Sequence, residues 1–250
     1  MGFRETDVKI IRSLFAYTVY FISTSLLGTL AFVASSVSRQ PKWAHLLGRL
    51  WANLNLWAAG VRVRLKGFEN LNSDQAYVFL SNHQSGFDIL ALMGKLRVLF
   101  AWLAKEELFR IPILGHAMRA AGYIPIDRSD RRKAVESLNQ TAAKVQEGTS
   151  VMIFPEGTRS PDGVLQEFKK GAFLLAIKSQ QFIVPIAISG SHRILAKRGK
   201  WIIQPGVIDI TIEKPISTLG LTVKDNDGLM RTVRETIRRH LTPEEGGPLP

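Results

Sequence analysis

Hydrophobic residues fill one long stretch near the N-terminus, residues 14–37, which contains no charged side chain. At about 1.5 Å of rise per residue, a helix of this length can cross a hydrocarbon layer roughly 30 Å thick. We therefore predict a membrane-associated helix that either spans the bilayer or enters and leaves it on one side. A cleaved signal peptide is disfavoured because the stretch exceeds the roughly 7–15 apolar residues of a signal core.

A second apolar pattern follows directly, with hydrophobic residues spaced three and four apart as on one face of a helix. Its positions are Trp43, Leu46, Leu47, Leu50, Trp51, Leu54 and Trp57. Such a stripe is typical of an interfacial membrane helix, and equally of a helix that packs on the protein's own core. Basic residues flank the first stretch on both sides, so they do not indicate its orientation. We expect a membrane-associated helical region over residues 1–60.

Beyond residue 60, short runs of β-forming residues alternate with helical patterns. The runs begin at Val61, Ala76, Gly122, Ser150, Ile183 and Val207. Helical periodicity covers residues 134–147, 168–178 and 227–241. This order predicts an α/β fold, a single domain with a largely parallel central sheet flanked by helices. We expect the domain over residues 61–241 and a flexible tail over residues 242–250.

The composition fits such a domain and adds a strong positive charge. Of the 250 residues, 46% are hydrophobic and 22% are charged, which suffices to bury a core in one domain. The 33 lysines and arginines exceed the 21 acidic residues and give a formal net charge of +12. That charge favours nucleic acid, an acidic membrane surface or phosphorylated small molecules as partners. The lack of cysteine excludes disulfides, thiolate zinc sites and thiol nucleophiles.

The chemistry is expected where loops leave the carboxyl ends of the strands, because ligands bind there in parallel α/β sheets. Four predicted strands run into polar segments, namely NHQSGFD from residue 82, DRSDRR from 127, PEGTRS from 155 and GSHR from 190. The sequence contains no glycine-rich dinucleotide turn, no phosphate-binding Walker loop, no HExxH zinc pair and no GxSxG nucleophile elbow. Catalysis must therefore draw on these four segments.

The first segment contains a histidine and a carboxylate separated by four residues, His83 and Asp88. An imidazole that a carboxylate orients can act as a general base. Asp88 could instead cap the helix that the apolar residues after it predict. Both interpretations stay open on the spacing alone, because a pair of this kind also arises by chance.

The third segment places a glycine turn next to an arginine. After Pro155, the residues Glu156, Gly157, Thr158 and Arg159 would expose backbone N–H groups beside a guanidinium, which suits a phosphate or an oxyanion. A surface turn with no binding role, followed by an arginine that faces solvent, would have the same sequence. Taken singly, other basic residues such as Lys105, Arg128 and Lys197 are expected to be solvated.

Together, NHQSGFD, GYIPIDR, FPEGTRS and VPIAISG resemble the four motifs of the glycerolipid acyltransferase family, in the same order. The likeness covers roughly residues 60–215 and is strongest to the bacterial 1-acyl-glycerol-3-phosphate (lysophosphatidic acid) acyltransferases. It implies transfer of an acyl chain from acyl-CoA or an acyl carrier protein thioester to the free sn-2 hydroxyl of 1-acyl-glycerol-3-phosphate, forming phosphatidic acid. Related enzymes that acylate other lysolipids or glycerol-3-phosphate share these motifs.

The resemblance also implies residue roles. His83 deprotonates the acceptor hydroxyl, and Asp88 holds the imidazole and balances its charge. The other expected substrate-binding residues are Glu156, Gly157, Thr158 and Arg159 for the acceptor and its phosphate, Arg128 and Lys105 for added positive charge, and Val184 with Pro185 for the shape of the pocket. Because the thioester co-substrate is already activated, no enzyme nucleophile is required. No metal and no bound cofactor are expected. The expected location is the cytoplasmic face of a bacterial inner membrane, with membrane lipids as partners.

Two other functions remain open from the residues. A membrane-tethered nucleic-acid-binding protein would use the basic surface, but the sequence contains neither a helix-turn-helix pattern nor a basic strand motif interleaved with aromatic residues. We therefore expect no nucleic-acid partner. A hydrolase would use His83 and Asp88 to activate water in place of an acceptor alcohol.

Overall fold

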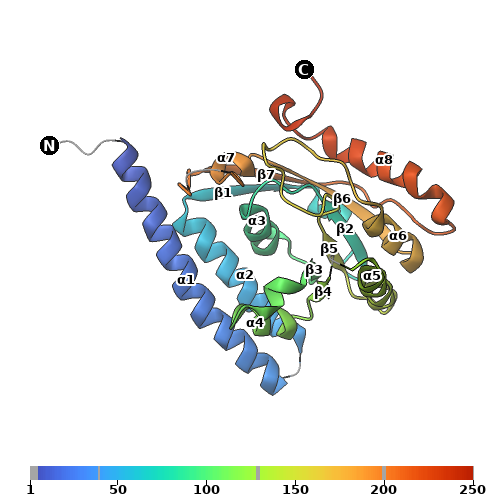
Figure 1. Ribbon diagram of the computed structural model, residues 1–250, viewed down its shortest axis with the longest axis horizontal. Coiled ribbons are helices and arrows are strands. Elements are labelled where there is room, and N and C mark those ends of the chain that lie inside the picture. Colours follow the sequence, from blue (N-terminus) through green and yellow to red (C-terminus); the bar gives the residue numbers. More distant parts are fainter. Residues whose placement is uncertain (1–4, 39, 128–129, 199–200, 250) are drawn as a thin grey trace.

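The computed structural model describes residues 5–38, 40–127, 130–198 and 201–249, and its centre is a seven-stranded sheet (Figure 1). The strand order is β1-β7-β6-β2-β5-β3-β4. The strands are β1 (Val61–Lys66), β2 (Tyr77–Ser81), β3 (Ala101–Lys105), β4 (Ile124–Ile126), β5 (Val151–Ile153), β6 (Phe182–Ser189) and β7 (Gly206–Ile212). Neighbouring strands are parallel except β6 and β7. The predicted largely parallel sheet is confirmed.

Helices cover both faces of this sheet. They are α1 (Glu5–Ser38), α2 (Pro41–Ala58), α3 (Phe87–Lys95), α4 (Leu114–Ala120), α5 (Arg131–Gln146), α6 (Lys170–Ser179), α7 (Ser191–Ile194) and α8 (Asn226–Arg238). Short 3-10 helices are η1 (Phe68–Asn70), η2 (Glu106–Arg110), η3 (Val223–Asp225) and η4 (Pro243–Glu245). Helices α1 to α4 lie on one side of the strands, and α5, α6 and α8 lie on the other (Figure 1).

The two faces of the sheet carry separate hydrophobic cores. Successive side chains of a strand point to opposite faces, so Tyr77 and Phe79 of β2 join one core while Val78 and Leu80 join the other. Helices α2 and α3 and part of α1 complete the first core, and α5, α6 and α8 complete the second. Because both faces are covered, the central strands are continuous hydrophobic runs without polar alternation.

Strand β3 is the strand that the sequence analysis missed, and the short helix α4 after it was not predicted either. The β3 sequence AWLAK contains two alanines and a lysine, which are weak β-formers, so the local pattern does not predict a strand. Pairing with its neighbours holds it in place, with Trp102 opposite Met152 of β5 and Leu103 opposite Ile124 of β4. The strand carries Lys105 to the same edge of the sheet as the polar segments.

Helix α2 is part of the domain and not of a separate N-terminal unit. Ala52 and Leu56 are buried in the first core, where α2 packs against α3. The predicted boundary at residue 60 therefore does not divide two cores. The packed face of α2 is not the predicted apolar stripe. Within that stripe no residue is fully buried, and the exposed members are Trp43, Leu46, Leu50 and Trp57. The outward side of the helix therefore keeps the apolar character of an interfacial helix.

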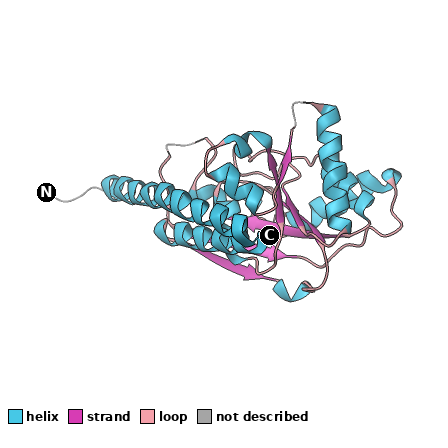
Figure 2. Cartoon of the chain, turned by 90° about the horizontal axis from the view of Figure 1, so that it is seen from below, coloured by secondary structure: helices cyan, strands magenta, loops and turns pink. Residues whose placement is uncertain are grey.

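Helix α1 leaves a long apolar face uncovered. Leu14, Phe21 and Leu30 are each more than half exposed, at 62%, 67% and 53%. Within the described residues, one helix is long and apolar enough to cross a membrane, Asp7–Ser38. Figure 2 shows its N-terminal end extending beyond the rest of the domain.

The C-terminal segment differs from the predicted flexible tail, because part of it packs on the domain. Glu245, in η4, is buried, and its carboxylate accepts hydrogen bonds from Ser189 Oγ at 2.5 Å and from the Gly190 N–H at 2.7 Å. Thr242 and Glu245 also form a capping box around η4. Proline, glycine and acidic residues predict disorder in the sequence, but buried donors on β6 fix this segment.

Candidate active site

The predicted catalytic and binding segments meet at one edge of the sheet. Strands β2, β3, β5 and β6 run in the same direction, so their carboxyl ends share that edge. His83 follows β2, Lys105 ends β3, Glu156 follows β5 and Gly190 follows β6. This is the edge where α/β folds bind ligands.

His83 and Asp88 form a hydrogen-bonded pair, with Nδ1 of the imidazole 2.8 Å from Oδ2 of the carboxylate. Asp88 lies in the first turn of α3 and is completely buried. Its Oδ2 also accepts the backbone N–H groups of Gln84 at 2.7 Å and Ser85 at 2.8 Å. Asp88 thus fixes the loop that leads into α3 and orients the histidine at once. It does not cap the helix, because both N–H groups precede α3, whose N-cap residue is Gly86. A carboxylate at Nδ1 favours the tautomer whose Nε2 accepts a proton.

The ring and backbone of His83 are fixed by the loop after β5. The imidazole stacks on Phe154 with ring centroids 3.9 Å apart and planes 7° from parallel. The backbone N–H of His83 donates to Glu156 Oε1 at 2.7 Å, and its carbonyl accepts the Ser160 N–H at 2.8 Å. The exits of β2 and β5 are therefore interlocked, and the base is held before a substrate binds.

Glu156 has a supporting place in this arrangement. It is 3% exposed, and it bonds the backbone of His83 and, through Oε2 at 3.4 Å, the N–H of Gln166. Burial raises the pKa of the Glu156 carboxyl to about 7, against the lowering effect of these hydrogen bonds. Glu156 is not among the described residues that line the cavity, and its carboxylate joins the loops after β2 and β5. That it binds the acceptor stays a prediction.

Gly157, Thr158 and Arg159 line the cavity next to His83. Gly157 has φ +77°, a left-handed conformation that favours glycine and lets the chain turn sharply after β5. A Cβ at Gly86 would lie 3.9 Å from Nη1 of Arg159, so the guanidinium lies against the loop that carries His83. The structure thus brings the predicted base and the predicted phosphate-binding arginine together.

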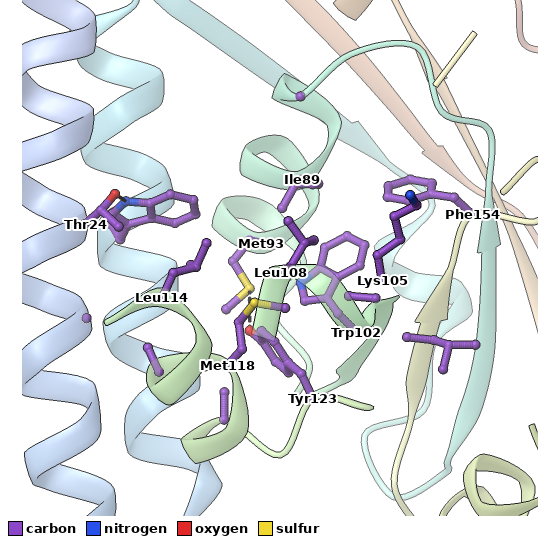
Figure 3. A pocket seen from close by; sticks show the side chains of 18 of the residues that line it. Thr24, Ile89, Met93, Trp102, Lys105, Leu108, Leu114, Met118, Tyr123 and Phe154 are labelled. Carbon is purple, nitrogen blue, oxygen red and sulfur yellow. Dashed lines mark hydrogen bonds between the residues drawn. The ribbon is translucent and has the colours of Figure 1, made fainter. Parts of the chain in front are cut away.

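The cavity has a volume of about 560 Å³ and lies between the helices and the strand exits. Helices α1 to α4 supply mostly apolar walls, and Figure 3 shows Met93, Met118 and Tyr123 converging there. Lys105 and Phe154 lie on the side away from Thr24 (Figure 3). The charged lining residues come from the strand exits. Such a cavity suits a ligand with a long apolar part and a polar head.

The other predicted residues divide into three groups. Lys105 lines the cavity with a side chain that is 57% exposed. Arg128 lies outside the described residues. Val184 and Pro185 are buried in β6 and are not among the described residues that line the cavity, so they do not shape it directly. A central strand covered on both faces sends its side chains into the two cores.

Lys197 reaches the site although the sequence analysis placed it among the solvated basic residues. It lies in the loop after α7, and its Nζ donates to Thr158 Oγ1 at 3.0 Å and to the Arg159 carbonyl at 2.7 Å. The exit of β6 was recognised as a candidate segment, but its sequence does not show where a residue seven positions past Gly190 points. In the part of the chain that the structure describes, no three acidic, histidine or cysteine side chains form a metal site.

A comparison with known protein families matches residues 62–189 to the family described as Acyltransferase. A chloroplastic 1-acyl-sn-glycerol-3-phosphate acyltransferase of Arabidopsis thaliana is 36% identical over 224 residues, which cover 86% of this chain and 62% of that protein. A mouse (Mus musculus) 1-acyl-sn-glycerol-3-phosphate acyltransferase alpha is 35% identical over 179 residues, covering 71% and 63%. The chain therefore spans less than two thirds of the length of these two relatives.

A solved structure extends the similarity to nearly the whole chain. It is the crystal structure of the 1-acyl-sn-glycerophosphate (LPA) acyltransferase, PlsC, from Thermotoga maritima. The TM-score is 0.82 at 26% sequence identity, with 94% of this chain and 95% of the other covered. The similarity includes the helices that wall the cavity as well as the sheet.

Proposed function

The chain belongs to the acyltransferase family, and from that premise we propose that it acylates the sn-2 hydroxyl of 1-acyl-glycerol-3-phosphate (lysophosphatidic acid) to form phosphatidic acid. The donor is acyl-CoA or an acyl carrier protein thioester. One observation carries the proposal: the His83 imidazole, bonded to the buried Asp88, lines a largely apolar cavity that Arg159 also lines. The names of the Arabidopsis, mouse and Thermotoga proteins support lysophosphatidic acid as the acceptor.

The geometry supports a direct transfer. Nε2 of His83 takes the proton of the acceptor hydroxyl while its oxygen attacks the thioester carbonyl, and the anionic Asp88 stabilises the resulting imidazolium. The tetrahedral intermediate then collapses, the carbon–sulfur bond breaks, and the departing thiolate takes the proton back from Nε2. One ester forms and one thioester is lost, so His83 returns to its neutral state without an acyl-enzyme intermediate.

The apolar cavity supports the binding of an acyl chain beside this base. Met93, Met118 and Leu27 contribute to walls that come from α3, α4 and α1. Each methylene group transferred from water into such surroundings contributes about 0.8 kcal/mol. The charged residues at the strand exits are then left for the phosphate of the acceptor, which cannot enter an apolar wall without loss of solvation.

A panel of acceptors tests this function. The protein is incubated with labelled acyl-CoA or acyl carrier protein thioester, and with lysophosphatidic acid, glycerol-3-phosphate or lysophosphatidylcholine in separate reactions. We expect the highest kcat/KM with lysophosphatidic acid and phosphatidic acid as its product. Faster acylation of glycerol-3-phosphate or lysophosphatidylcholine with both donors would show that the acceptor is assigned wrongly.

Arg159→Lys is expected to raise the KM for lysophosphatidic acid by about tenfold or more and to leave the KM for the thioester nearly unchanged. The guanidinium can hold a phosphate through two parallel hydrogen bonds, whereas an ammonium group offers only a point charge. Steady-state kinetics with each substrate varied in turn measure both constants. Unchanged acceptor kinetics in this variant would remove Arg159 from the phosphate site.

We further propose that α1 attaches the protein to a membrane, on the cytoplasmic face of a bacterial inner membrane, because both thioester donors are found in the cytoplasm. Leu14→Lys combined with Phe21→Lys places two charges on the exposed face of α1, each costing up to about 3 kcal/mol within a bilayer. We expect most of this variant to leave the membrane fraction on sedimentation. Leu219→Lys, at a 77% exposed position outside α1, is the matched control and should stay bound. Wild-type protein that is soluble without detergent or high salt would contradict attachment.

A further inference from the structure

Lys197 is a cation of the active-site edge, beside Arg159 and Lys105, that none of the family motifs contains. Its ammonium group bonds both the side chain of Thr158 and the backbone of Arg159. It also lines the cavity together with His83. Two of its three N–H groups are used by these contacts, which leaves one for a ligand.

No carboxylate among the described residues forms an ion pair with the cations at this point, because neither Lys197 nor Arg159 has one within 4.0 Å. Other lysines of the domain do have such partners, as Lys170 does with Asp227 at 2.9 Å. Two unpaired cations beside one cavity repel each other, so an anion that binds between them is stabilised by both.

The loop that carries Lys197 is held firmly against the His83 loop. Ser191 Oγ lies 3.3 Å from Gln84 Oε1, and Ser85 Oγ donates to the Leu195 carbonyl at 2.7 Å. At the start of the loop, the buried Glu245 carboxylate binds the N–H of Gly190. These contacts fix both ends of the segment that leads to Lys197, so the position of its ammonium group follows from the fold and not from a freely moving surface chain.

We propose that Lys197 determines the preference of this site for a phosphomonoester acceptor: it positions the Thr158–Arg159 segment and adds its own positive charge to that of Arg159 for the phosphate. This inference rests on the proposed function. A phosphate monoester carries a charge of about −1.5 to −2 at pH 7, which one arginine does not neutralise. The phosphodiester of lysophosphatidylcholine carries one negative charge, which the choline cation of the same headgroup balances, so this acceptor gains less from an added cation.

The test is Lys197→Met, which keeps an unbranched side chain and removes the charge and the donors. We expect kcat/KM for lysophosphatidic acid to fall about tenfold to a hundredfold, the range for a lost charge-assisted hydrogen bond. The kcat/KM for lysophosphatidylcholine should change much less, so the ratio of kcat/KM for lysophosphatidic acid to that for lysophosphatidylcholine decreases. The KM for the thioester should stay the same. Lys197→Arg should restore most of the preference.

Arg198→Met is the matched control, because it removes the same charge from the neighbouring, exposed position. It should leave the acceptor ratio unchanged. Wild-type protein that does not acylate lysophosphatidic acid would overturn the proposed function and this inference together. The role of Lys197 alone would be overturned if the wild-type protein forms phosphatidic acid and the Lys197→Met variant has the same ratio of kcat/KM between the two acceptors as wild type. An equal loss with both acceptors would also overturn it, because it would show a structural effect without specificity.

Discussion

His83→Ala is expected to lower kcat for acyl transfer by about 10²–10⁴ while the KM for lysophosphatidic acid changes little. The substitution removes the only imidazole that lines the described part of the cavity, and with it the proton acceptor for the attacking hydroxyl. Initial rates of phosphatidic acid formation measure the effect.

A matched control separates this loss from damage to the fold. His240 lies outside the site, where its Nε2 is 2.5 Å from Glu213, and His240→Ala should keep the wild-type rate. The ring of His83 also stacks on Phe154, so thermal unfolding of both variants should be compared with wild type. A folded His83→Ala protein that transfers acyl chains at a near-normal rate would refute the mechanism.

Asp88→Asn is expected to lower kcat in the same direction, by up to about 10⁴. The amide oxygen can replace Oδ2 toward His83, Gln84 and Ser85, so the ring keeps its place. The amide nitrogen then occupies the position of Oδ1, a buried atom with no hydrogen-bond partner among the described residues. The lower kcat is therefore expected mainly because the variant lacks the negative charge that stabilises the imidazolium.

The double variant tests whether the two residues act as one unit. We expect His83→Ala with Asp88→Asn to be little slower than the slower single variant, because a carboxylate without its imidazole has no catalytic effect. Rates of all four proteins under one set of conditions give the comparison. Losses that multiply in the double variant would show that Asp88 acts independently of His83.

The parts of this site that the sequence predicts are those that follow directly from a strand. His83, Asp88 and Arg159 lie within seven residues of the ends of β2 and β5, so the strand direction fixes their position at the shared edge. The α/β fold itself follows from alternating β and helical patterns, which the two buried cores enforce. These features depend on short-range sequence and on the general geometry of parallel sheets.

Long-range packing determines what the sequence did not show. Strand β3 is defined by its neighbours and not by its own residues, and the apolar cavity needs four helices that come from two distant parts of the chain. Lys197 reaches the site because Ser191 and Leu195 bind the His83 loop. Val184 and Pro185 match a family motif, but their strand is covered on both faces. No local pattern records these contacts.

The fate of the thioester tests the central claim, that this site transfers an acyl chain to an alcohol and does not hydrolyse it. Labelled acyl-CoA and acyl carrier protein thioester are each incubated with the wild-type protein, with and without lysophosphatidic acid, and free fatty acid and phosphatidic acid are quantified. We expect thioester consumption to require the acceptor and to match phosphatidic acid formation one to one. Release of free acid at the same rate in both reactions, without phosphatidic acid, would identify a hydrolase and contradict the account.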